Sequence, residues 1–378
     1  MIAAGEKESD MFYGIELARG VAALMVLLSH YAHWLTDGPT LLNFFWTGVD
    51  LFFVISGFVF ARLLLSGQVS PMPFFIRRFF RLYPLYCLAV LTYWWLWPTP
   101  PQGISLLFDH LAMLHTTHSR AEAFYLNPAF WSLPVEVEFY LLIPWLTWLF
   151  RWRHALWLTA LVSLLVRGVI MLQSPPESES LWFFLSVHIT GILPEFLIGV
   201  GLYPLVQALA RAPQRIKRRY TGLSMVGGLL LLGGLADFFV TQGDAGFAQH
   251  PLLRAYFGVL CALGYALVLA PLILITQSSS TDARHHPSGR TTQAWGYRIS
   301  LLLGSLSYSI YLMHNATPVM LQKLWPSLSG PTLALSALVL TLVLAGLMHR
   351  LIEEPARLWG RHLSRRWHAR RPISPEDI

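Results

Sequence analysis

The stretch GIELARGVAALMVLLSHYAHW, residues 14–34, decides the fold class of this chain. It is apolar over about the 20 residues that a membrane-spanning helix requires. Arg19 near its start and His30 well inside it are 11 residues apart, so they share one helix face about 16 Å apart along the axis. Ionisable groups inside a span are costly and by default mark a functional site. The alternative is that Arg19 snorkels to the interface and His30 only packs.

The composition of the whole chain is that of a polytopic membrane protein. Of its 378 residues, 55% are hydrophobic and 12% are charged, with a mean hydropathy of +0.51, whereas soluble domains carry about 25% charged residues. We predict an all-α integral membrane protein with about ten transmembrane helices, the first of them retained because no signal-peptide cleavage site follows it. The predicted spans are residues 14–35, 44–65, 82–97, 133–150, 155–172, 184–207, 221–241, 252–275, 299–320 and 330–350.

Basic residues indicate the orientation, because cytoplasmic loops carry the excess of Lys and Arg. They gather after the second, fourth, sixth and eighth spans and in the tail from Arg350 onward, whereas the opposite loops hold only Arg120, Arg254 and Lys323. We therefore expect both termini in the cytoplasm, and the same bias explains the net charge of +7 without nucleic acid. The expected organisation is a cytoplasmic N-terminus (1–13), a membrane domain (14–360) and a basic cytoplasmic tail (361–378).

Cysteines and adjacent histidines give no sign of a disulfide or a metal site. Cys87 and Cys261 both fall within predicted spans, so no disulfide framework is indicated. His285 and His286 are metal ligands by type, but they lie in a Ser/Gly/Pro-rich loop without a Cys partner. We therefore predict no metal.

Several ionisable residues fall at one depth, in the outer half of the predicted membrane domain. Counting the helical rise from each span end places His30, Asp50, Glu136, Glu138 and His314 at a similar level. One buried polar residue is often structural, but two histidines and three carboxylates at one level indicate a polar chamber. A histidine oriented by a carboxylate is suited to removing a proton from a hydroxyl group.

Six motifs in a fixed order then carry a family resemblance. They are the Arg-x10-His pair in ARGVAALMVLLSH (18–30), GVDLFFVISGF (48–58), RRFFRLYPLY (77–86), WSLPVEVEFYLLIP (131–144), LGSLSYSIYLMH (303–314) and EEPARLWG (353–360). From Ile15 to Trp359 the chain resembles acyltransferase family 3, the integral membrane O-acyltransferases of bacterial surface glycans. Val137 departs from the family's doubled Glu, which puts a role for Glu138 in doubt but not one for Glu136.

The resemblance implies a reaction across a bacterial inner membrane. An acyl group, most often acetyl, passes from cytoplasmic acyl-CoA to a hydroxyl of an extracytoplasmic glycan or glycolipid, with no tightly bound cofactor. A separate periplasmic or glycan-assembly partner is left open. Some family members carry a fused soluble domain after the last span, and we expect none here.

The motifs suggest where the donor is held. Arg77, Arg78 and Arg81 are placed to bind its phosphates, although positive-inside topology alone would also put arginines there. Arg19 is expected to meet the pyrophosphate or the pantetheine arm.

The passage for that arm and the reacting groups are expected further up the bundle. Phe52, Phe53, Ser56 and Gly57 are candidates to line the passage, and the alternative for the small residues is a tight helix contact. At its end His30 is predicted to act as the base on the acceptor hydroxyl. Asp50 or Glu136 would orient His30, and His314 completes the predicted catalytic set.

Two other classes of function also accommodate buried charges. A transporter of glycans or lipid-linked sugars would more often show internal repeats and Gly/Pro-broken helices, and neither is clear in this sequence. A sensor or scaffold of an envelope complex would need no set of histidines and carboxylates.

Overall fold

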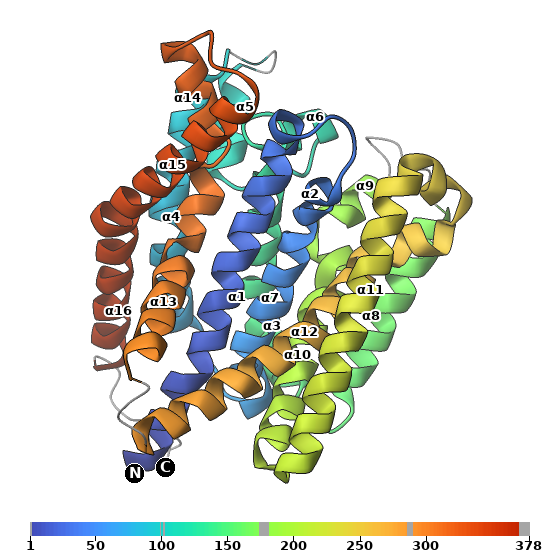
Figure 1. Ribbon diagram of the computed structural model, residues 1–378, viewed down its shortest axis with the longest axis vertical. Helices are drawn as coiled ribbons and strands as arrows, with labels where there is room; N and C mark the ends of the chain where they lie inside the picture. Colours follow the sequence, from blue (N-terminus) through green and yellow to red (C-terminus); the bar gives the residue numbers. More distant parts are fainter. Residues whose placement is uncertain (1, 99, 101–102, 174–180, 286–289, 370–378) are drawn as a thin grey trace.

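The computed structural model describes residues 2–98, 100, 103–173, 181–285 and 290–369, in which helices are the only regular structure (Figure 1). The helices are α1 (Ile2–Leu35), α2 (Leu41–Phe44), the 3₁₀ turn η1 (Phe45–Thr47), α3 (Gly48–Ser66), α4 (Pro71–Leu96), α5 (Ile104–Leu111), α6 (Arg120–Ala123), the 3₁₀ turn η2 (Pro128–Trp131), α7 (Ser132–Leu149), α8 (Ala155–Gln173), α9 (Leu181–Ser186), α10 (Ile189–Arg211), α11 (Gln214–Gln249), α12 (Pro251–His285), α13 (Arg290–Met313), α14 (Ala316–Leu324), α15 (Gly330–Met348), the π-helix η4 (His349–Glu353) and α16 (Glu354–Ala369).

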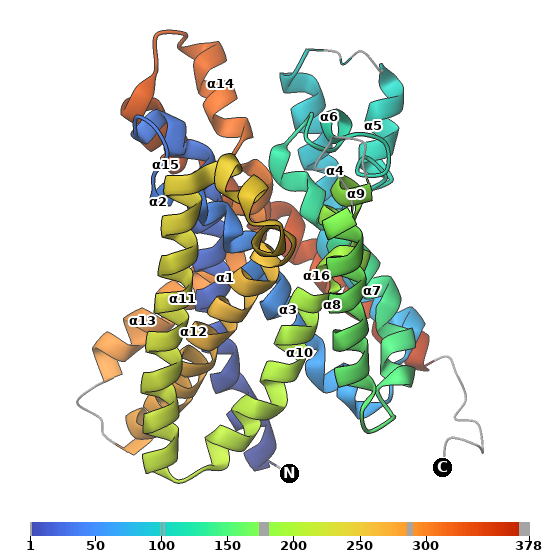
Figure 2. The same ribbon diagram turned by 90° about the vertical axis from the view of Figure 1, so that its right-hand side faces the viewer.

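The long helices form a bundle with two distinct ends (Figures 1 and 2). The short helices α2, α5, α6 and α14 gather at the end drawn uppermost, which we term the upper end. Helix α1 begins at the opposite, lower end and packs against α3, α12 and α13. Its polar side chains can therefore face other helices in place of lipid.

Seven helical segments in the described part of the chain are long and apolar enough to cross a membrane. They are Tyr13–Leu35, Leu41–Ser66, Ala155–Gln173, Leu181–Arg211, Gln214–Gln249, Pro251–Thr276 and Gly330–Trp367, and the shorter apolar helix Arg298–Met313 accompanies them. Helices α4 and α7 cover two more of the predicted spans, but they are not among the segments that are long and apolar enough to cross a membrane. The all-α polytopic prediction is confirmed, whereas the count of about ten spans is not.

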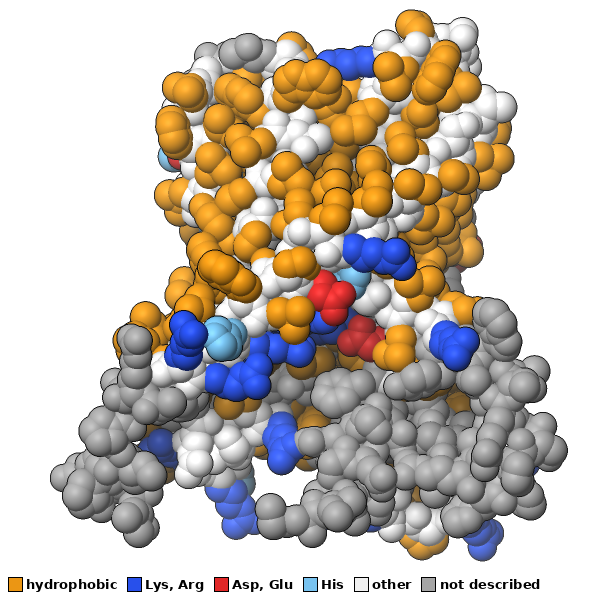
Figure 3. Space-filling model, turned by 90° about the vertical axis from the view of Figure 1, so that its left-hand side faces the viewer, with side chains coloured by type: hydrophobic (Ala, Val, Ile, Leu, Met, Phe, Trp, Pro, Cys, Tyr) orange, Lys and Arg blue, Asp and Glu red, His pale blue; other side chains and the backbone are white. Residues whose placement is uncertain are grey.

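Large apolar side chains lie exposed along α8, α11 and α15, as expected of a surface in contact with lipid. Trp157 on α8 is 65% exposed, Leu230 on α11 is 72% exposed and Leu335 on α15 is 60% exposed. Figure 3 shows another face whose upper part is mostly hydrophobic, with charged side chains gathered in a band below. Apolar surface of this extent is unusual on a soluble monomer.

Helices α3 and α10 approach closely because each presents a glycine to the backbone of the other. A Cβ atom at Gly57 would lie 1.9 Å from the carbonyl oxygen of Phe196, and one at Gly199 would lie 2.0 Å from that of Val54. Small residues allow such close approach between membrane helices. Gly57 therefore lies in the tight helix contact that was weighed as the alternative, and its place beside an acyl passage stays a prediction. The neighbouring Ser56 is also buried.

Candidate functional site

Two predicted catalytic histidines meet where α1 and α13 pack together. The ring centroids of His30 and His314 are 5.0 Å apart, and the ring planes are inclined by 40°. His314 is fully buried and His30 is half-buried. A glycine lets the two helices come close, because a Cβ atom at Gly20 would lie 2.5 Å from the Cβ atom of Leu303.

His314 lies at a break between α13 and α14. Carbonyl groups at a helix end lack an intrahelical donor, and away from water they need another partner. The Tyr31 hydroxyl donates to the His314 carbonyl at 2.6 Å, and the Tyr93 hydroxyl donates to the Leu312 carbonyl at 3.0 Å. The Asn127 amide in turn donates to the Tyr93 oxygen at 3.0 Å. These bonds hold the backbone at His314 in place.

The surroundings of the His314 ring assign its tautomer. Nδ1 lies 2.8 Å from the carbonyl oxygen of Tyr311 and 3.3 Å from that of Ile310. A carbonyl oxygen only accepts, so Nδ1 carries the proton and Nε2 keeps its lone pair. Nε2 is buried and has no hydrogen-bond partner among the described residues. A free basic nitrogen on a ring next to His30 is suited to orienting that histidine or sharing a proton with it.

A cavity of about 660 Å³ reaches His30 from the upper end. Asp50 lines the same cavity, so two of the four predicted catalytic residues share one space. Pockets of this size, with apolar walls and a few converging polar groups, are typical of small-molecule sites. The aromatic residues of the wall are Trp46, Phe124, Trp131, Trp182, Phe183, Phe239, Phe247 and Phe257.

Arg167 and Glu195, two of the charged residues that line this cavity, are absent from the sequence-based prediction. Arg167 on α8 donates through Nε to the Ala255 carbonyl at 2.6 Å and through Nη1 to the Gly191 carbonyl. The same Nη1 atom lies 3.8 Å from Oε1 of Glu195 on α10. Arg167 thus ties together the upper ends of α8, α10 and α12. Both residues lie within predicted spans, so the rule that singled out Arg19 would also have found them.

The carboxyl groups of Asp50 and Glu195 converge at the floor of the cavity. A Cβ atom added at Gly258 would lie 2.7 Å from Glu195 Oε1 and 3.3 Å from Asp50 Oδ1. Both carboxyl oxygens of Glu195 and Oδ2 of Asp50 are buried without a hydrogen-bond partner in the described part of the chain. Buried polar atoms require partners, so this floor is suited to hydroxyl groups or water.

Glu136, the fourth predicted catalytic residue, belongs to a different neighbourhood. Its carboxylate accepts a short hydrogen bond from the Tyr140 hydroxyl, one turn further along α7. The Arg78 guanidinium lies 5.8 Å from the centre of the Tyr140 ring. Glu136 therefore faces the arginines of α4 and does not share a chamber with His30. Its axial depth was predictable, but its direction depends on how α7 is rotated.

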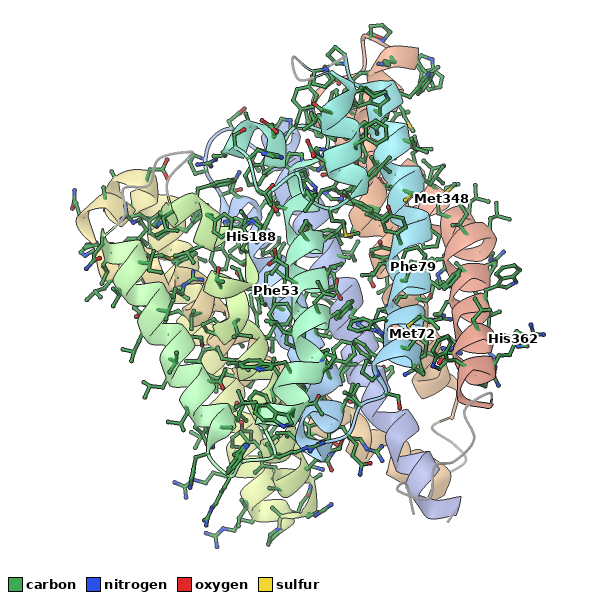
Figure 4. All side chains as sticks on the ribbon, turned by 180° about the vertical axis from the view of Figure 1, so that it is seen from behind. Phe53, Met72, Phe79, His188, Met348 and His362 are labelled. Carbon is green, nitrogen blue, oxygen red and sulfur yellow. The ribbon has the colours of Figure 1, made fainter. Side chains whose placement is uncertain are left out.

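Glu138 also turns away from His30. One of its oxygens lies 2.5 Å from His188 Nδ1, and the other accepts from the Ile189 backbone N–H at 2.7 Å. A carboxylate at the start of a helix satisfies unpaired backbone N–H groups, so Glu138 supports the start of α10. Figure 4 shows His188 on this side of the bundle, above Phe53.

The predicted donor arginines separate into two groups. Arg19 lies 3.1 Å from Glu16 and is coupled electrostatically to Arg81, and Arg78 stands over the ring of Phe60 at 5.0 Å. These three arginines form a cluster nearer the lower end. Arg77 points elsewhere and donates to the Ser364 hydroxyl of α16 at 2.6 Å.

The two phenylalanines predicted to line a passage have different neighbours. Phe52 lies edge-on to Tyr311, with ring centroids 5.7 Å apart, and Tyr311 lies 6.0 Å from His314. Phe53 is buried and packs against Phe196 at 4.9 Å. Phe52 thus lies near the histidine pair, whereas Phe53 joins α3 to α10.

The π-helix η4 is a feature that sequence reasoning missed. Glu353 within it accepts from the Ser309 hydroxyl at 2.9 Å and lies 3.2 Å from His349 Nδ1. Single π turns are frequent at functional sites. The EEP motif marked this position, but only as part of the family pattern.

One group of side chains among the described residues has ligand atoms close enough to hold a metal. The ligand atoms of Asp109, His118 and Glu122 lie within 4.8 Å of one another, with His118 exposed and the two carboxylates half-buried, and the group is not part of the cavity. The predicted absence of a metal therefore stays a prediction. The side chains of His285 and His286 lie outside the described part of the structure.

Comparisons with known proteins agree with the motif pattern. The family model described as "Acyltransferase domain" matches residues 12–350. The chain is 24% identical over 373 residues to "O-acetyltransferase OatA" of Staphylococcus aureus, covering 92% of this chain and 57% of the relative. It is 25% identical over 399 residues to "Putative peptidoglycan O-acetyltransferase YrhL" of Bacillus subtilis, covering 93% and 56%.

A third relative is matched over nearly its whole length. This is "Acyltransferase MdmB" of Streptomyces mycarofaciens, 26% identical over 394 residues, with 94% of this chain and 92% of the relative covered. By contrast, the chain spans little more than half the length of the two relatives named O-acetyltransferases. No solved structure matches.

Proposed function

Since the chain belongs to the acyltransferase family whose domain matches residues 12–350, we propose that it is a membrane O-acetyltransferase. It takes an acetyl group from acyl-CoA and transfers it to a hydroxyl of a saccharide. The observation that carries this proposal is the contact between His30, which lines the cavity, and His314, whose Nε2 lone pair is free.

In the proposed reaction His30 removes the proton of the acceptor hydroxyl. The hydroxyl oxygen attacks the thioester carbonyl, the carbon–sulfur bond breaks, and the CoA thiolate leaves and takes up a proton. His314 orients His30, the role that the sequence had suggested for Asp50 or Glu136. General-base catalysis of this kind contributes about 10²- to 10⁴-fold to a rate.

The donor is proposed to bind nearer the lower end. Arg19, Arg78 and Arg81 supply positive charge there, and guanidinium groups bind phosphate strongly. Arg19 and His30 lie on one face of α1, about 16 Å apart along its axis, so the pantetheine arm would run along α1 between them.

We further propose that the lower end faces the cytoplasm of a bacterial inner membrane. The excess of basic residues in the loops at that end supports this orientation. A reporter enzyme that works only in the cytoplasm should be active when it is fused after Ile378. Activity of a periplasmic reporter at that position would contradict the orientation.

The transfer itself is tested with membranes that contain this chain and radiolabelled acetyl-CoA. We expect label in a saccharide fraction, and its loss in His30→Gln at equal protein abundance. Thioester consumption without acylated saccharide would contradict the acceptor class. Transport of a saccharide without thioester consumption would favour an exporter.

A further inference from the structure

We propose that the cavity binds an anionic saccharide, with the anionic group held by Arg254 and Arg120 at the upper rim. This inference rests on the proposed function, because it assigns the class of acceptor to the same cavity. The shared chemistry is a carboxylate or a phosphate on a sugar.

The two arginines at the rim have no acidic partner among the residues that the structure describes. Arg254 on α12 lies 5.7 Å from the centre of the Trp182 ring, and its Nε is buried without a hydrogen-bond partner among the described residues. Arg120, the first residue of α6, is exposed and lies 5.9 Å from the centre of the Phe124 ring. Asp244 also lines the cavity, but within the described ranges no ion pair joins it to either arginine.

A comparison within the cavity makes these two cations unusual. Arg167, deeper in the same cavity, already has two backbone carbonyls and Glu195 as partners. Arg254 and Arg120 have aromatic neighbours that hold them in place without neutralising them. Guanidinium groups bind carboxylate and phosphate through paired, charge-assisted hydrogen bonds.

The walls and floor of the cavity fit the rest of a saccharide. Trp46, Trp131 and Trp182 offer flat apolar surfaces for the C–H faces of a sugar ring. At the floor, the unpartnered oxygens of Asp50 and Glu195 can accept from sugar hydroxyls. The rim therefore offers unpaired cations, and the floor offers carboxyl oxygens beside an arginine that already has partners.

This separation of charge orients the bound saccharide. An anionic group would be attracted to the unpaired arginines of the rim and not to the floor, where Arg167 already has Glu195 and two carbonyl groups as partners. A hydroxyl at the opposite side of the sugar is then directed away from the rim, into the cavity that His30 also lines. A neutral saccharide would lose the rim contacts and bind in more than one orientation.

The experiment uses the full chain in membranes of the organism that produces it, with radiolabelled acetyl-CoA. Labelled saccharide is separated on an anion-exchange resin before and after mild acid hydrolysis, which cleaves glycosyl phosphates but leaves uronic acids. We expect retention on the resin. Retention lost after hydrolysis identifies a glycosyl phosphate, retention lost only after alkaline phosphatase identifies a phosphate monoester, and retention that survives both treatments identifies a carboxylate. Label in a neutral saccharide would overturn the proposal.

Substitutions of the two rim arginines test whether these residues bind the anionic saccharide. Losing a charge-assisted hydrogen bond costs about 1.5–3 kcal/mol, or roughly 10- to 100-fold in affinity. Arg254→Gln should therefore raise the KM for the retained saccharide fraction at least about tenfold with little change in kcat, and Arg120→Gln should act in the same direction. Arg254→Lys keeps the positive charge, so its KM should lie between those of the unchanged protein and Arg254→Gln. A folding defect would not produce this partial recovery.

A matched control lies at the upper end but outside the cavity. Lys323 donates to the Leu96 carbonyl at 2.5 Å and lies 5.8 Å from the centre of the Trp95 ring, so Lys323→Gln should leave this KM unchanged. Equal KM values for the Arg254→Gln, Arg120→Gln and Lys323→Gln variants would overturn the proposal.

A binding measurement separates this inference from the proposed function. The anionic saccharide fraction should raise the Tm of the purified protein, and the shift should be smaller in Arg254→Gln. If that shift occurs while no saccharide is ever labelled, the proposed function fails and the binding site stands. If neither labelling nor a shift occurs, both fail.

Discussion

The two polar regions of the bundle hold buried charge in different ways. Near the lower end, Arg19, Arg78 and Arg81 are balanced by Glu16, Glu136 and aromatic rings. In the upper cavity, the oxygens of Asp50 and Glu195 and the rim cations have partners left to find. Buried charges are retained when they are paired, and an unpaired buried group is costly. The upper region is therefore suited to a polar ligand or water. In the lower region Arg78 Nε also lacks a hydrogen-bond partner among the described residues, but the neighbouring carboxylates would have to give way for a phosphate to bind.

We expect the largest effect from a substitution of the reacting group itself, His30. His30→Gln should lower kcat for acetyl transfer by about 10²- to 10⁴-fold, because glutamine keeps hydrogen bonding but cannot act as a base near neutral pH. The measurement is radiolabelled transfer at matched membrane abundance.

His314→Gln is the matched variant on the neighbouring helix. It should lose less activity than His30→Gln, because His314 acts through His30. Near-normal transfer by His30→Gln would return that histidine to a packing role, and equal losses would mean that the two histidines act together or that the base is His314.

The next effect tests whether the lower region binds the donor. Arg81→Ala should raise the apparent KM for acetyl-CoA by roughly 10- to 100-fold, through the loss of a charge-assisted phosphate contact. Arg77→Ala is the matched control and should change this KM far less, since Arg77 is bonded to Ser364. If the KM is unchanged in Arg81→Ala, these arginines only set the orientation of the protein in the membrane and do not bind the donor.

A smaller effect distinguishes the two carboxylates that the sequence had placed together. Asp50→Asn should raise the KM for the saccharide about tenfold, because one cavity oxygen becomes a donor. Glu136→Gln should leave that KM unchanged and alter the KM for acetyl-CoA, because Glu136 faces Arg78 and Arg81. Both variants altering the same KM would mean that one site, and not two, binds both substrates.

The smallest effect on catalysis concerns the contact between α3 and α10. Gly57→Ala should lower the free energy of unfolding by about 1–3 kcal/mol through overpacking, with little change in activity per folded molecule. Gly227→Ala on α11 has open space around it and should stabilise the protein slightly. Thermal unfolding in detergent compares the two. If Gly57→Ala slows acetyl transfer without changing the free energy of unfolding, Gly57 lies beside an acyl passage.

Much of the candidate site was predictable from residues inside apolar spans. The depths of His30 and His314 followed from the helical rise, and the structure brings their rings to 5.0 Å. The same reasoning applied to spans 155–172 and 184–207 would have included Arg167 and Glu195, which line the cavity. The π turn at Glu353 could not be read from periodicity, because its five residues are too few to display a period of their own.

The sequence by itself determined which segments are helical and apolar and how deep each polar residue lies, because hydropathy and axial rise are properties of one helix. It also determined the family, through motifs spread from Ala18 to Gly360. Only the tertiary structure decided which polar residues meet. Glu136 turned to the arginines of α4, Glu138 to the start of α10, and Gly57 into a helix contact. The physical reason is that the rotation of a helix about its axis is set by the side chains of its neighbours, which no single span encodes.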